Sequence, residues 1–110
     1  MRKNSGKNAL VHADTAQLDA SATRETVLTF TDPFDKLVGD IVTEQVCEVY
    51  IIPMPDGETE GAPSDVLTTE AGVPTRYTYS DLGVDTVKLK VINTAGATCS
   101  IAHYVHAVQS

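Results

Sequence analysis

The chain is dominated by short runs in which apolar and polar residues alternate, broken by turn residues every eight to twelve positions. The clearest run places Val87, Leu89 and Val91 in alternation with polar neighbours, among them Lys88 and Lys90. A period of two sends successive side chains to opposite faces of an extended strand. We therefore predict a strand whose three apolar residues face a core and whose two lysines face solvent.

Further runs of this kind predict the remaining strands, because β-branched and aromatic residues favour strands while Pro, Gly, Asp and Asn mark turns. Together the runs cover residues 26–31, 34–43, 46–52, 66–69, 75–80, 86–93 and 98–108. In the third run, the position of Glu48 indicates that Cys47, Val49 and Ile51 face inward. Gly39 interrupts the second run, which predicts either a strand with a bulge or two short strands around a kink.

Seven or eight strands without a convincing helix predict an all-β fold, either an antiparallel β-sandwich or a jelly-roll-like barrel. We expect successive strands with short links to be antiparallel neighbours. The length of 110 residues fits one domain, which we assign to residues 23–110. Residues 1–22 are assigned as a flexible or extended N-terminal arm with few core contacts. Within it, residues 10–22 are read as extended arm or as a first edge strand.

The charge of the chain narrows the class of partner. A formal net charge of -7 argues against nucleic acid, whose phosphates need clustered Lys and Arg, and against an anionic membrane surface. No apolar run has the length of a membrane span. The first residues lack the apolar region of a secretory signal, so we expect synthesis in a reducing cytosol.

Cysteine and histidine positions give no metal site. Cys47 and Cys99 lie in apolar runs and are predicted to be buried thiols, with a disulfide between neighbouring strands as the alternative. His103 and His106 are three residues apart on a predicted strand and face opposite sides, so they cannot converge on a metal with His12.

The remaining chemistry-bearing residues predict no enzyme and no cofactor. The loop acids Asp56, Glu58 and Glu60 do not have the spacing of an EF-hand. The sequence contains no Gly-x-Ser-x-Gly and no glycine-rich phosphate loop. Tyr77 and Tyr79 share one strand face, either as a pair in the core or as an exposed patch for a ligand.

Residues 25–38 and 86–105 resemble small virion proteins of tailed bacteriophages. In those proteins a Thr-rich strand leads through an aromatic-containing turn to an apolar strand, and a final pair of strands closes a β-sandwich. The family includes capsid decoration, or cement, proteins. The resemblance implies a non-enzymatic virion protein, made in the host cytoplasm, that binds a major capsid protein or copies of itself as a homo-oligomer or on a lattice. The alternative is another tail or neck sandwich, or a module for adhesion to host-surface glycans.

A protein of this kind acts through contact surfaces. The loop at residues 53–63 is long, acidic and stiffened by proline, and Met54 is its one large apolar residue. We predict that Met54, Pro55 and Asp56, together with Leu10 and Val11 of the arm, contact another copy or a capsid protein. The competing interpretation is a solvated loop that faces away from the shell.

Overall fold

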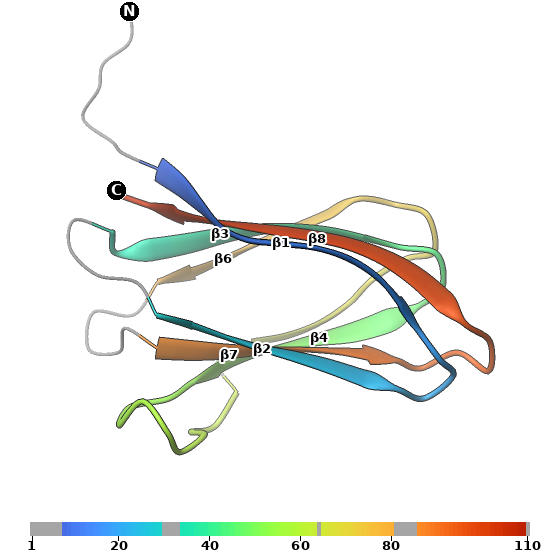
Figure 1. The fold of residues 1–110 in the computed structure, drawn as a ribbon, viewed down its shortest axis with the longest axis horizontal. Coiled ribbons are helices and arrows are strands. Elements are labelled where there is room, and N and C mark those ends of the chain that lie inside the picture. Colours follow the sequence, from blue (N-terminus) through green and yellow to red (C-terminus); the bar gives the residue numbers. More distant parts are fainter. Residues whose placement is uncertain (1–7, 30–33, 64, 81–85, 110) are drawn as a thin grey trace, which may run out of the picture.

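The computed structural model describes residues 8–29, 34–63, 65–80 and 86–109. These residues form eight strands and no helix, in two four-stranded antiparallel sheets packed face to face (Figure 1). The strands are β1 (Asn8–Leu18), β2 (Thr23–Thr29), β3 (Lys36–Thr43), β4 (Cys47–Pro53), β5 (Asp65–Thr68), β6 (Thr75–Ser80), β7 (Thr86–Asn93) and β8 (Cys99–Val108). The predicted all-β sandwich is therefore confirmed. No helix in the described part of the chain is long and apolar enough to cross a membrane.

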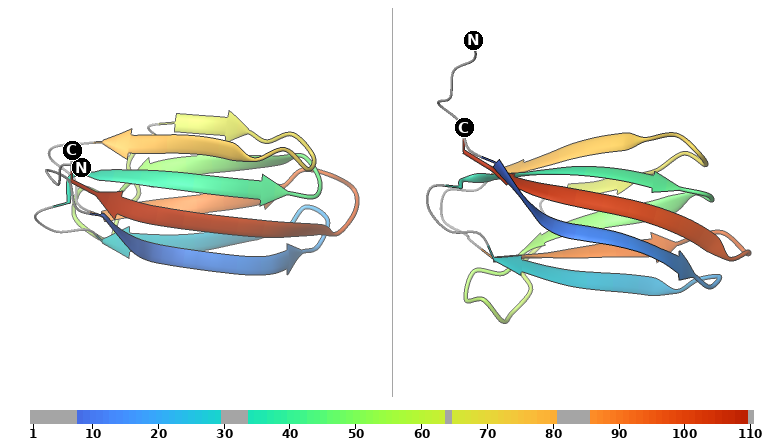
Figure 2. Two further views of the ribbon diagram at one scale, coloured as in Figure 1. Left: turned by 90° about the horizontal axis from the view of Figure 1, so that it is seen from above. Right: turned by 45° about the horizontal axis from the view of Figure 1, so that its top comes forward.

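The strand order identifies the sandwich as a jelly roll. Sheet A has the order β1-β8-β3-β6 and sheet B the order β2-β7-β4-β5; the four strands of sheet A lie side by side in the left view of Figure 2. First and last strands pair, then second and seventh, third and sixth, fourth and fifth, as in a long hairpin rolled into two sheets.

The expectation that successive strands are neighbours is correct only for β4 and β5 and wrong elsewhere. Every other link crosses from one sheet to the other. Short links suffice for this: the three residues between β3 and β4 can span roughly 10 Å, which is the usual separation of packed sheets.

The N-terminal segment is part of the sandwich from Asn8 onward. Strand β1 pairs with β8 from Asn8 opposite Val108 to Leu18 opposite Cys99, and Leu18 is buried. The edge-strand interpretation of residues 10–22 is therefore correct for residues 10–18, the strand begins two residues earlier than predicted, and the expectation of few core contacts is wrong there. The strand was hard to recognise because its inward-facing residues include His12 and Asp14 rather than an apolar series. Residues 1–7 lie outside the described residues.

The core lies between the sheets and follows the predicted alternation. Val87, Leu89 and Val91 are buried, and the side chains of Lys88 and Lys90 face outward. Strand β3 is continuous and pairs with β6 and β8 without a bulge. The bulge or kink predicted at Gly39 is therefore wrong: this glycine makes room for the ring of Tyr77 on β6.

The two cysteines face each other across the core. Cys47 on β4 and Cys99 on β8 are completely buried, and their Sγ atoms lie 3.6 Å apart without a bond. Burial, together with the hydrogen bond between the two thiols, raises the pKa of Cys47 to about 12. The prediction of buried thiols is confirmed, and the two residues belong to opposite sheets rather than to neighbouring strands.

Candidate functional site

The histidines do not assemble a metal centre. His103 points into the sandwich, where its Nε2 lies 2.6 Å from the hydroxyl of Tyr77, and the ring of His12 packs edge-on against it at 5.5 Å. His106 lies on the other face of β8, as predicted. Burial and the neighbouring His12 lower the pKa of His103 to about 4, so this imidazole is neutral. Among the described residues, no group of three or more His, Cys, Asp or Glu is placed to hold a metal.

The tyrosines of β6 are core residues. Tyr77 and Tyr79 alternate with exposed neighbours and are both 5% exposed. The core-pair interpretation is confirmed, and the exposed-patch interpretation is wrong because both rings point between the sheets. Burial raises the pKa of Tyr77, so the hydroxyl beside His103 stays protonated.

The loop after β4 is folded back onto the protein. Met54 donates its backbone N–H to the carbonyl of Thr86 at 2.8 Å and is only 5% exposed. Met54 therefore cannot serve as the surface anchor that we predicted, because its side chain is already packed in the domain. Pro55 and Asp56 are exposed. The Asp56 carboxylate accepts hydrogen bonds from the N–H groups of Thr59 and Glu58, which lower its pKa and fix the turn.

An ion-pair cluster attaches this loop to the outer face of sheet B. The Glu60 carboxylate lies 2.8 Å from Lys88 Nζ and 3.3 Å from Lys90 Nζ, and Glu25 on β2 approaches the same two ammonium groups at 3.5 and 3.6 Å. The hydrogen bonds from the lysines lower the pKa of Glu60 and raise that of Lys88. At the base of the loop, Gly61 donates its N–H to the carbonyl of Pro53 at 2.8 Å.

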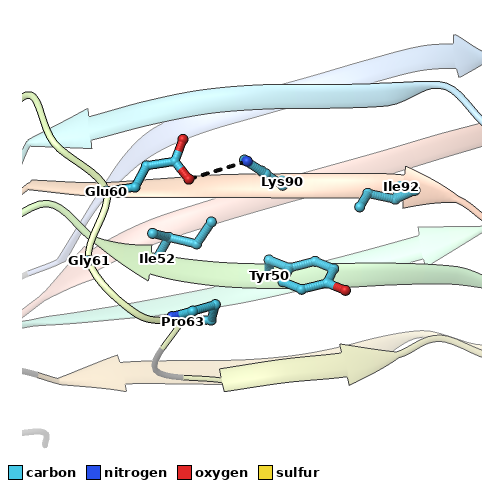
Figure 3. Close-up of a pocket in the computed structure, with 7 residues that line it drawn as sticks. All are labelled: Tyr50, Ile52, Glu60, Gly61, Pro63, Lys90 and Ile92. Atoms are coloured by element: carbon cyan, nitrogen blue, oxygen red, sulfur yellow. Dashed lines mark ion pairs between the residues drawn. The ribbon is translucent and has the colours of Figure 1, made fainter.

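The attached loop and the sheet enclose a small groove of about 310 Å³, which we call the sheet B groove (Figure 3). Its lining residues come from β4, β7 and the loop: Tyr50, Ile52, Lys90, Ile92, Glu60, Gly61 and Pro63. Alternation sends Tyr50 and Ile52 outward on β4 while Val49 and Ile51 fill the core. The Tyr50 hydroxyl donates to Glu48 at 3.2 Å, and the nearby carboxylate raises the pKa of Tyr50.

Sequence reasoning missed this groove. The alternation around Glu48 already placed Tyr50 on the outer face, and Lys90 was predicted to face solvent. The pairing of Tyr50 opposite Lys90 depends on the register between β4 and β7, which no local pattern contains.

The outer face of sheet A has a different character. Leu10 is 55% exposed and lies opposite His106 beside a β-bulge, where Val11 is also exposed. Tyr104 on β8 is 40% exposed on the same face. The charged side chains on this face are Lys36, Asp40 and Arg76. Arg76 and Asp40 form an ion pair with two hydrogen bonds, from Nε to Oδ1 at 2.8 Å and from Nη2 to Oδ2 at 3.3 Å.

The predicted contact residues thus fall on two sides of the molecule. Leu10 and Val11 belong to β1 in sheet A, whereas Pro55 and Asp56 belong to the loop below sheet B (Figure 1).

The fold is shared with solved structures of low sequence identity. No protein-family model and no curated protein matches the chain. The crystal structure of PBSX exported protein XepA superposes with a TM-score of 0.75 at 12% identity, covering 92% of this chain and 36% of XepA. The enzymatically active domain of Bacteriophage CBA120 tailspike protein 4 gives a TM-score of 0.59 at 9% identity, covering 94% and 19%. The CBM36-1 domain of a xylanase from the Trinervitermes trinervoides hindgut metagenome gives 0.51 at 10%, covering 93% and 95%.

Proposed function

We propose that the chain is a non-enzymatic structural protein of a tailed-phage virion, a capsid decoration protein that is made in the host cytoplasm and binds the outer shell. In this proposal the outer face of sheet A contacts the major capsid protein, or neighbouring copies on the lattice. Leu10, Val11 and Tyr104 supply the apolar contacts.

The observation that carries this proposal is the low charge of that face. The chain has a net charge of -7, yet sheet A presents three charged side chains on its outer face, two of which neutralise each other. The cores of protein interfaces are depleted of charged residues and enriched in tyrosine. The face presents an exposed Tyr104, which lies opposite Ala13 of β1 and Asp40 of β3, together with the exposed Leu10, Val11 and Val42.

The free edge of sheet A gives further support. Among the described residues, β1 pairs with β8 alone, so its second edge carries unpaired backbone groups along eleven residues. Exposed edges of this length invite pairing with another chain, and a bulge and an inward-pointing charge are common means of preventing it. Val11 lies in such a bulge and Asp14 is such a charge. Docking on a shell would cover the part of the edge near Leu10.

The comparisons support the virion setting at the level of fold. A tailspike protein of a bacteriophage contains a domain of this architecture, and jelly rolls recur in viral capsid proteins. The gene is expected to lie beside that of a major capsid protein.

The test is occupancy of the shell by surface variants. Particles of the encoding phage, assembled without this chain, are mixed with the wild-type protein, with Tyr104→Glu, or with the matched control Val27→Glu on the outer face of sheet B. Val27 is 51% exposed, so both substitutions replace an exposed apolar side chain by a charge. We expect Tyr104→Glu to lower the bound copies per particle at least tenfold and Val27→Glu to leave them unchanged. Equal occupancy of both variants would exclude sheet A as the docking face.

A further inference from the structure

We infer that the sheet B groove binds the ring of a neutral sugar, so that the chain carries a carbohydrate-binding site on the face opposite its docking surface. The site is independent of the proposed function, because none of the residues that line the groove belongs to sheet A.

Part of the groove is apolar, although Ile52 is itself almost fully buried. Tyr50 lies along β4 with Ile52 beside it, Ile92 lies on the neighbouring strand, and Pro63 closes the loop side (Figure 3). A pyranose presents C–H groups on its ring face, and an aromatic ring joined to a polar hydroxyl suits a ligand that is apolar on one side and polar on the other. A volume of about 310 Å³ is at the lower end of the range for ligand sites, so the site fits a small ligand.

The rim of the groove is polar in a way that matches hydroxyl groups. The Lys90 ammonium donates hydrogen bonds and the Glu60 carboxylate accepts them, within the same groove. Glu48 adds a second carboxylate, which already accepts the hydroxyl of Tyr50. A sugar hydroxyl both donates and accepts, so adjacent hydroxyls of one ring can satisfy an ammonium and a carboxylate together.

The charge balance favours a neutral ligand. Lys88 and Lys90 are offset by Glu25 and Glu60, which lie within 3.6 Å of them. Glu48, beside Tyr50, adds a negative charge without a cation within ion-pair distance among the described residues. A phosphate or an acidic sugar would therefore meet a site of slight negative charge, and a neutral sugar would meet no opposing field.

The groove is formed before any ligand arrives. Glu60 attaches the loop to both lysines, the Gly61 N–H closes its base, and proline occupies positions 53, 55 and 63. A wall held in place by these contacts does not have to be ordered on binding, which lowers the entropic cost of taking up a small ligand.

The experiment uses the full chain on an immobilised panel of neutral plant, fungal and bacterial oligosaccharides, with acidic glycans and inorganic phosphate as competitors. We expect binding to at least one neutral glycan, no competition by phosphate, and at least a tenfold loss of affinity in Tyr50→Ala. Tyr104→Ala, which truncates the exposed tyrosine of sheet A, is the matched control and should bind like wild type. Tyr50→Phe keeps the aromatic ring and should retain most of the binding. Its binding would show that Tyr50→Ala loses affinity because the ring is removed.

The inference is overturned if no neutral glycan binds, if only acidic glycans bind, or if Tyr50→Ala binds as well as Tyr104→Ala. Particle occupancy is measured in parallel. Tyr50→Ala should occupy the shell normally, so failure of the sugar site and failure of the docking proposal give different results.

Discussion

Gly39 and Tyr77 are opposite each other on β3 and β6, and the Tyr77 ring occupies the space that a side chain at position 39 would need. A Cβ atom built on Gly39 would lie 2.1 Å from Cζ and 2.4 Å from the hydroxyl oxygen of Tyr77. The same hydroxyl is held by His103 on β8. The buried Tyr77–His103 pair can therefore take this arrangement only because residue 39 has no side chain.

Replacing Gly39 by alanine should destabilise the fold, because the ring cannot move without breaking the hydrogen bond to His103. We expect a loss of about 1–3 kcal/mol or more in the free energy of unfolding, the range for overpacked cores. Gly96→Ala is the matched control, since nothing lies within 4 Å of its Cβ position, and it should change stability by less than about 0.5 kcal/mol. Urea unfolding of both variants measures this, and equal midpoints would show that the Tyr77 ring is not confined.

The buried His103 should make stability depend on pH in the mildly acidic range. Its pKa is about 4 in the folded protein and ordinarily 6.5, so between these values the unfolded chain binds a proton that the folded chain does not. The contribution of the neutral His103 to the free energy of unfolding is therefore fully present above pH 6.5. It falls by about 1.4 kcal/mol per pH unit toward pH 4, which amounts to roughly 3 kcal/mol in total. The hydrogen bond from Arg24 lowers the pKa of Asp14, so protonation of this carboxylate reduces the stability of the fold further only below the ordinary value of 3.8.

Chemical denaturation at a series of pH values tests this dependence. His103→Gln, whose amide can still reach the Tyr77 hydroxyl, should flatten the fall between pH 6.5 and 4. His106→Gln, on the outer face of β8, should leave it in place. A steep fall that persists in His103→Gln would assign the pH dependence to another group.

The ion pairs of Glu60 should hold the loop rather than stabilise the whole domain. Exposed ion pairs contribute little to global stability, but this one joins a loop to β7 through two lysines. In Glu60→Gln we expect faster hydrogen exchange at the Gly61 amide, which bonds to Pro53, with a melting temperature close to that of wild type. Glu58→Gln, in the same loop, is the control. Unchanged exchange at Gly61 would mean that the backbone bond alone fixes the loop.

The inward-facing residues of the strands can be predicted from the sequence, because the alternation of apolar and polar residues is a local pattern. Val87, Leu89 and Val91 were identified from their neighbours alone, and so were the inward-facing residues of β4. Strand pairing was beyond such reasoning, because each link that crosses between sheets looks the same in sequence as a hairpin link.

The candidate sites depended on information that the sequence does not display locally. Met54 reads as an exposed apolar residue in a polar loop, and it is buried because its backbone continues the pairing of β4 toward Thr86. Tyr50 and Lys90 are distant in sequence and come together only through the register of β4 with β7. Leu10 and Val11 are predicted from the sequence to contact a partner, and the structure shows them exposed. The sheet face to which they belong follows only from the pairing of β1 with β8.

Imaging of the decorated particle by electron cryomicroscopy, at a resolution that shows strands, tests the docking proposal most directly. We predict that the chain lies on the outer shell with β1, β8, β3 and β6 against the capsid protein, with Tyr104 and Leu10 in the contact and Tyr50 facing solvent. A map in which the outer face of sheet A is exposed to solvent, or particles that carry no density for this chain, would contradict the proposal.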